Sequence, residues 1–115
     1  MTLGTLVDIV SSLRGPAGCP WDRAQTPSSM RPYLIEEAYE VLDAIEDEDD
    51  QAQCEELGDL LFQIVLLSEM ARQRGAFDFA DVERGIAQKM VQRHPHVFGD
   101  DPDGSVQAWE QRKAA

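Results

Sequence analysis

Apolar residues recur at helical spacing along most of the chain, and no stretch shows the sustained alternation or the β-branched runs of a strand. Intervals of three and four between apolar residues place them on a shared helix face. The expected helices cover about residues 2–14, 32–46, 52–74 and 79–93, followed by a last short helix that Ser105 caps. We therefore predict an all-α fold, a helical bundle of about four to five helices.

Two segments between the helices have the composition of loops. Residues 15–31 are rich in glycine, proline and serine, and Thr26 and Pro27 stand like a helix N-cap and a first helical residue. Residues 94–105, HPHVFGDDPDGS, contain two prolines and two glycines. Both segments are predicted as loops, and the acidic run EDEDDQ is predicted as a solvated turn between the second and third helices.

Acidic residues interrupt the apolar pattern of the second helix. The stripe that a helical wheel marks as its core face contains Leu34, Ala38, Val41 and Ile45. Glu37 and Glu40 are three residues apart, so they are neighbours on the helix surface, and they lie beside one edge of that stripe. Glu36 points further round, toward solvent.

The third helix is apolar almost all the way round, which predicts burial on more than one side. The residues expected inside a fuller bundle or at a subunit interface are Leu60, Leu67 and Met70. Glu56 and Asp59, again three residues apart, share one face of this helix with Gln63. An oligomer that completes the bundle is therefore expected.

The two acidic pairs have two interpretations. Each pair could be a solvated helix face. Alternatively, two antiparallel neighbouring helices would converge Glu37, Glu40, Glu56 and Asp59 on one point, where four negative charges need cations to coexist. An all-oxygen site of this kind suits Mg²⁺ or Mn²⁺. A di-iron bundle site is disfavoured, because it needs Glu-x-x-His pairs and the chain's two histidines lie in the 94–105 segment.

Composition narrows the classes of function. The chain of 115 residues is expected to form a single domain, residues 1–115. A formal net charge of −12 argues against nucleic-acid binding. Two cysteines without a CxxC or disulfide framework favour a reducing compartment, and neither a signal peptide nor a membrane span is predicted, so a cytoplasmic location is expected.

Four segments, GCPWDRAQT, EEAYEVLDAI, EELGDLLFQ and QRHPHVF, occur in this order along the chain. In sequence and spacing they resemble the MazG family of nucleoside triphosphate pyrophosphohydrolases, from about residue 6 to Lys113. The resemblance is to the first, N-terminal type of domain in tandem members of the family, in a single copy. It implies that Glu37, Glu40, Glu56 and Asp59 are the Mg²⁺ ligands, because they match the E-x-x-E and E-x-x-D signature.

Basic and aromatic residues of the C-terminal third are candidates for substrate contacts. Lys89 and Arg93 fall on the apolar stripe of the fourth helix, where they either snorkel over a core edge or bind the triphosphate. In the family that the chain resembles, the matching K-x-x-x-R pattern contacts nucleotide phosphates. The resemblance also places Trp109 and Lys113 at the nucleotide, whereas Trp109 could equally anchor the last helix. Trp21 could stack on a base or plug the end of the bundle.

The resemblance implies a reaction, the hydrolysis of a (deoxy)nucleoside triphosphate to a nucleoside monophosphate and pyrophosphate. Such chemistry depends on positioning and on charge neutralisation by metal ions. Glu36 is a candidate to orient or deprotonate the attacking water. The alternative is a non-hydrolysing module that binds a nucleotide or mediates dimerisation within a larger tandem-domain protein.

Overall fold

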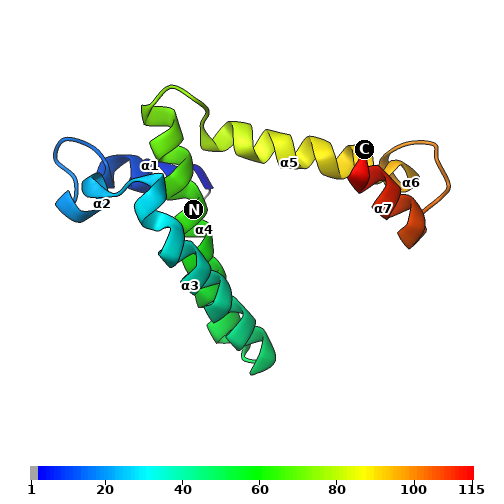
Figure 1. The fold of residues 1–115 in the computed structure, drawn as a ribbon, viewed down its shortest axis with the longest axis horizontal. Coiled ribbons are helices and arrows are strands. Elements are labelled where there is room, and N and C mark those ends of the chain that lie inside the picture. The colour runs from blue at the N-terminus through cyan, green and yellow to red at the C-terminus, as the bar shows by residue number, and fades with distance from the viewer. Residues whose placement is uncertain (1–2) are drawn as a thin grey trace. The chain divides into compact units, whose positions relative to one another are not determined.

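The structure is a computed structural model that describes residues 3–115 (Figure 1). Within this range it contains helices and no strand, so the all-α prediction is confirmed. The helices are α1 (Leu3–Leu13), α2 (Pro20–Ala24), α3 (Pro27–Glu46), α4 (Asp50–Gln73), α5 (Phe79–Arg93), α6 (Pro95–Phe98) and α7 (Val106–Ala114).

The chain divides into two compact units, Met1–Phe79 and Ala80–Ala115. The first unit contains α1 to α4, and the second contains nearly all of α5 together with α6 and α7. None of the helices within residues 3–115 combines the length and the hydrophobicity that a membrane span requires.

α3 begins five residues earlier than the sequence pattern suggested, at Pro27 instead of Pro32. Its N-terminus is fixed by a capping box, in which the Ser29 backbone N–H donates to the Thr26 hydroxyl (3.1 Å) and the Thr26 N–H donates to the Ser29 hydroxyl (2.8 Å). Pro32 lies inside the helix. The start signal of Thr26, Pro27 and Ser29 thus outweighs the single backbone hydrogen bond that Pro32 cannot make.

Two short helices occupy segments that were predicted as loops. α2 lies in the 15–31 segment and α6 in the 94–105 segment, so these parts of the loop predictions are wrong. Each begins with a proline, whose fixed φ angle is compatible with the first turn of a helix. The glycine and proline content correctly indicated where the long helices end. It did not indicate that the short helices α2 and α6 form within the segments that connect them.

α3 and α4 lie side by side as an antiparallel pair, connected by residues 47–49 (Figure 1). The Ala52 backbone N–H donates to the Asp49 carboxylate (3.0 Å), which caps α4. All residues of the EDEDDQ run are exposed, as predicted, but only residues 47–49 form the turn, because Glu46 ends α3 and α4 begins at Asp50, two residues earlier than expected. Because the connection is short, it fixes which turn of α3 faces which turn of α4.

The core of the first unit joins three helices. Its buried residues are Val10 of α1, Met30 of α3, and Val65, Leu66 and Met70 of α4. Burying a side chain of this size stabilises the fold by roughly 1.5–3 kcal/mol. The cluster lies toward the N-terminal end of α3 and the C-terminal half of α4, so it packs these two helices together at the end opposite their connection.

The expected core face of α3 was partly wrong. Val41 is buried and Leu34 is half-buried, but Ala38 is exposed and Ile45 is 53% exposed. The residues of α3 that are buried are Met30, Val41 and Ala44. The physical reason is that α3 carries a second apolar face. We call it the outer face of α3, and it consists of Ile35, Tyr39, Leu42 and Ile45, all exposed by more than half.

Arg112 of α7 ties the second unit together. Its guanidinium donates to the carbonyl oxygens of Arg93 (3.3 Å) and Asp103 (2.8 Å), and forms an ion pair with Asp101 (3.1 Å). Ser105 caps α7 as the sequence predicted, because its hydroxyl accepts a hydrogen bond from the Ala108 N–H (3.1 Å). α5 also has the bounds that the sequence predicted.

Candidate metal centre

The structure brings together four carboxylates from α3 and α4. Glu37 and Glu40 of α3, together with Glu56 and Asp59 of α4, each offer one oxygen, and these oxygens all lie within 4.8 Å of one another. We call these four residues the carboxylate cluster. The convergence follows from the helix geometry, because each pair with a three-residue spacing faces the other across the antiparallel contact. Their role as metal ligands stays a prediction.

Burial, hydrogen bonding and neighbouring negative charge raise the pKa of two carboxyl groups of the cluster. Burial, followed by a hydrogen bond to Glu40 and by the negative charges of the other three carboxylates, raises the pKa of Glu37 to about 7. A hydrogen bond to Glu40 raises the pKa of Glu56, with smaller effects from burial and neighbouring charge. Without a cation, the cluster therefore tends to hold a proton near neutral pH.

Two oxygens of the cluster are buried without a partner. Oε2 of Glu37 and Oε2 of Glu56 are inaccessible to solvent and accept no hydrogen bond within the described part of the chain. Burying a carboxylate oxygen is unfavourable unless an ion or a donor compensates it. A hard divalent cation fits this donor set, which consists of oxygen atoms alone.

Glu36 lies outside the carboxylate cluster. It is exposed on α3, in agreement with its expected outward direction, and its carboxylate is not among the four that converge. Its proposed role in orienting water stays a prediction.

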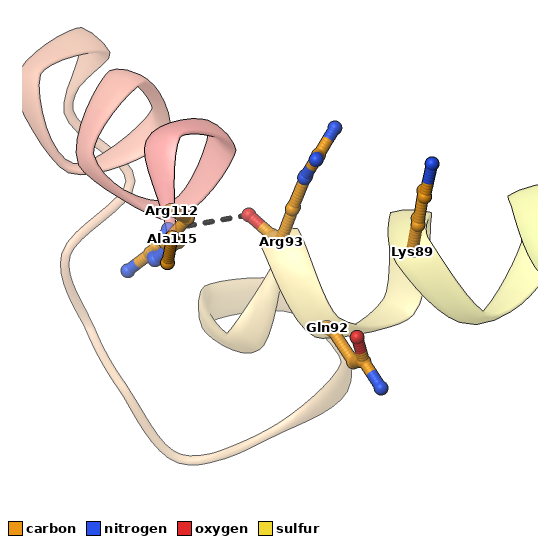
Figure 2. A pocket seen from close by; sticks show the side chains of 5 residues that line it. All are labelled: Lys89, Gln92, Arg93, Arg112 and Ala115. Atoms are coloured by element: carbon orange, nitrogen blue, oxygen red, sulfur yellow. Dashed lines mark hydrogen bonds between the residues drawn. The ribbon is translucent and has the colours of Figure 1, made fainter.

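Lys89 and Arg93 lie in the second unit, where they line a pocket of about 360 Å³ with Gln92, Arg112 and Ala115. Figure 2 shows the side chains of Lys89 and Arg93 projecting from the same side of α5, while Gln92 points the other way. Lys89 is exposed and Arg93 is half-buried. The K-x-x-x-R spacing thus presents two cations together, which an anion could bind.

Sequence reasoning missed Arg112, the third cation of this pocket. No motif marked it, and its importance follows from contacts with residues 9 to 19 positions earlier in the chain. Because its guanidinium is already engaged by carbonyl and carboxylate oxygens, Arg112 supports the shape of the pocket while Lys89 remains exposed to solvent.

Trp109 packs within the second unit. Its ring lies 4.9 Å from the ring of His94, and the Nδ1–H of His94 donates to the carbonyl oxygen of Met90. These contacts agree with the anchoring interpretation of Trp109. Lys113 of α7 is exposed. The nucleotide contacts assigned to Trp109 and Lys113 stay predictions.

Trp21 does not plug the end of a bundle. Half of its surface is exposed, and its ring makes an edge contact with the ring of Tyr33 on α3, at 5.8 Å between centroids. Tyr33 precedes Glu37 by one helical turn. The exposed aromatic pair of Trp21 and Tyr33 therefore lies about one helical turn of α3 away from Glu37 of the carboxylate cluster.

Comparisons with known proteins give relatives at high similarity. A protein of Thermotoga maritima named nucleoside triphosphate pyrophosphohydrolase/pyrophosphatase MazG is 52% identical over 95% of this chain, and the match covers 43% of that protein. The nucleoside triphosphate pyrophosphohydrolase of Escherichia coli K12 is 50% identical over 94% of this chain, again covering 43% of the relative. The chain thus spans less than half the length of these relatives.

A solved structure and a family model agree with this similarity. The crystal structure of a mazG-related protein from Thermotoga maritima matches with a TM-score of 0.75 and 26% identity, and the match covers 97% of this chain and 99% of that one. The family model described as the MazG nucleotide pyrophosphohydrolase domain matches residues 25–98, which include the carboxylate cluster and both Lys89 and Arg93. The chain belongs to the MazG nucleotide pyrophosphohydrolase domain family.

Proposed function

We propose that this chain catalyses the Mg²⁺-dependent hydrolysis of (deoxy)nucleoside triphosphates to nucleoside monophosphate and pyrophosphate. The observation that carries the proposal is the carboxylate cluster, with its two buried oxygens that have no partner. Membership of the MazG family supports it, and so do the names of the Thermotoga and Escherichia relatives. Although the chain divides into two compact units, one family model matches residues of both, which supports treating residues 1–115 as one domain.

Glu37, Glu40, Glu56 and Asp59 would hold the cation. We assign Mg²⁺ because the donors are carboxylate oxygens alone, and Mn²⁺ shares this preference. When bound, the cation would neutralise phosphate charge and lower the pKa of water. The chain's own contribution is positioning, since α3 and α4 hold the four oxygens in place before any ligand arrives.

Other residues receive roles toward the substrate. Lys89 and Arg93 are assigned to the phosphates, because they present two positive charges on one side of α5. Trp109 and Lys113 are assigned to the nucleotide by the family resemblance. Glu36, exposed and adjacent in sequence to Glu37, is assigned to orient or deprotonate the attacking water. Free cysteines at positions 19 and 54 support a reducing, cytoplasmic location.

The chain is proposed to self-associate as a homodimer or higher homo-oligomer. The outer face of α3 presents apolar side chains at helical spacing to solvent, and α4 adds Leu57 (52% exposed) and Ile64 (38%). Exposed apolar side chains in this number are unfavourable in water and are typical of an interface. A second copy of the chain offers the same surface, which is the requirement for a twofold contact.

A second candidate function is a module that binds nucleotide or dimerises without hydrolysis. The observation that favours it is the length of the relatives, since this chain matches only 43% of the Thermotoga and Escherichia proteins. An assay for pyrophosphate and orthophosphate, with a panel of NTPs and dNTPs plus Mg²⁺, distinguishes the two candidates. Pyrophosphate release supports the hydrolase, and no release of either product supports the module.

Replacement of Glu40 or Glu56 by glutamine is expected to reduce pyrophosphate release by about 100-fold or more, because one ligand oxygen loses its charge while the shape is kept. Helical content, measured by circular dichroism, should be unchanged. Glu55→Gln is the matched control, since Glu55 neighbours Glu56 but is exposed and outside the cluster. Turnover within about threefold of the parent in both cluster variants would contradict the metal assignment.

Lys89→Ala and Arg93→Ala are each expected to weaken binding of a nucleoside triphosphate by about tenfold or more, because a hydrogen bond to a charged group contributes about 1.5–3 kcal/mol. Binding of the corresponding nucleoside should change little. Isothermal titration calorimetry with both ligands measures the difference, with Gln88→Ala, exposed on the same helix, as control. Equal losses for both ligands would instead assign the two cations to the packing of α5.

Light scattering at micromolar concentration is expected to give at least twice the mass of one chain. Leu42→Lys, in the middle of the outer face of α3, should shift the mass toward the single chain because it places a charge in the interface. Val106→Lys, at a residue that is 78% exposed in the second unit, is the control. A parent that is monomeric at this concentration would rule out the self-association proposal.

A further inference from the structure

Gln63 is a buried polar residue that the fold alone does not explain. It lies on α4 with 7% of its surface exposed, and its amide oxygen Oε1 is buried without a hydrogen-bond partner in the described residues. An amide oxygen is stable in the interior only when something donates to it. The other buried polar residues of α4 have partners, because the Ser68 hydroxyl donates to the carbonyl oxygen of Ile64 (2.8 Å) and Glu69 forms an ion pair with Arg72. An apolar side chain would therefore serve packing better at position 63.

The unpartnered oxygens belong to residues of α3 and α4. Within residues 3–115, the buried side-chain oxygens that lack a partner are Glu37 Oε2, Glu56 Oε2 and Gln63 Oε1. Two of the three belong to the carboxylate cluster. Gln63 follows Glu56 by seven residues and Asp59 by four, so at about 100° per residue it lies between them in angle on the same face of α4.

From helix geometry we expect the Gln63 amide to lean toward the cluster. Side chains of an α-helix tilt toward its N-terminus, so the amide of Gln63 leans over the turn that carries Asp59. Glu37 tilts in the same sense on α3, which runs antiparallel to α4. Because the helices are antiparallel, the Glu37 and Gln63 side chains tilt in opposite directions along the pair. We therefore expect the Glu37 carboxylate and the Gln63 amide to approach the same height along the helix axes. This position is the inner end of the cluster, nearest the core residues Met30 and Met70.

The choice of a neutral amide fits a position beside four carboxylates. A fifth acid would add repulsion to a cluster that already raises the pKa of Glu37 and Glu56. A lysine or arginine would compete with a cation. An amide oxygen accepts a hydrogen bond without adding charge. Mg²⁺ keeps several water molecules when proteins bind it, and the hydrogens of these waters need acceptors.

We propose that Gln63 is a positioning residue of the metal centre, whose buried amide oxygen accepts a hydrogen bond from a water molecule in the hydration shell of the cation. It thereby fixes that water at the inner end of the carboxylate cluster and raises the affinity for the cation. The inference rests on the proposed function, because it requires that the cluster binds a divalent cation.

The test measures the affinity for Mg²⁺ itself, with no nucleotide present. Thermal melting of the full chain is followed during a Mg²⁺ titration from a chelated start, for the parent, Gln63→Met and Gln63→Glu. Methionine keeps the length of glutamine and removes the acceptor oxygen, whereas glutamate keeps an oxygen at the same place. The control is Gln51→Met, at an exposed residue in the first turn of α4, twelve positions before Gln63.

Gln63→Met should melt at or above the parent in chelator, because a buried oxygen without a partner is removed. It should need about tenfold more Mg²⁺ for half of its thermal shift, which is the size of effect typical of residues that support metal ligands. Gln63→Glu should need no more Mg²⁺ than the parent, and Gln51→Met should stay within about twofold of it.

Two results would overturn the inference while leaving the metal centre in place. One is a Gln63→Met variant whose half-maximal Mg²⁺ concentration lies within twofold of the parent, as expected if Gln63 only fills space. The other is a Gln63→Glu variant that loses Mg²⁺ affinity as strongly as Gln63→Met, because the acceptor oxygen would then be irrelevant. A parent without any Mg²⁺ shift would overturn the metal assignment of the proposed function, and this inference with it.

Discussion

Repulsion among four carboxylates is the constraint on which the rest of this structure depends. Glu37, Glu40, Glu56 and Asp59 oppose the contact between α3 and α4, because their charges approach one another as the helices pack. Apolar burial at one end of the pair and a short connection at the other hold the helices together against this repulsion. The fold thus stores unfavourable electrostatic energy at the place where a cation would release it.

The same constraint explains the unusual polarity of α4. A helix with so many apolar residues would be expected to bury mainly hydrocarbon, yet one face of α4 carries Glu56, Asp59 and Gln63, of which Asp59 is exposed and Gln63 is buried. Buried polar oxygens without partners are rare in proteins; of the three that the described residues contain, two belong to the carboxylate cluster, and the third, on Gln63, shares a face of α4 with Glu56 and Asp59. The proposed cation site would account for the three together.

Local spacing predicted the convergence of the carboxylates, because residues three apart on a helix must share a face. It also predicted the bounds of α5 and the Ser105 cap, which depend on neighbouring residues in the sequence. The exposure of Ile45 could not be predicted in this way, since α3 has two apolar faces and only packing against α1 and α4 decides which is buried. The contacts of Arg112 and the isolation of the Gln63 oxygen likewise arise from tertiary structure. The helical spacing placed Gln63 on the same face of α4 as Glu56 and Asp59, but it indicated no function for Gln63.

Thermal melting of the parent and of Asp59→Asn, each in EDTA and in saturating Mg²⁺, tests most directly whether the four carboxylates form a shared cation site. A ligand at about 100 times its dissociation constant adds roughly 2.7 kcal/mol, which for a domain of this size raises Tm by about 10 °C. We expect the parent to show a rise of this order, and Asp59→Asn to melt above the parent in EDTA but to gain little from Mg²⁺. A parent that does not respond to Mg²⁺, or an Asp59→Asn variant that melts below the parent in EDTA, would contradict the shared cation site.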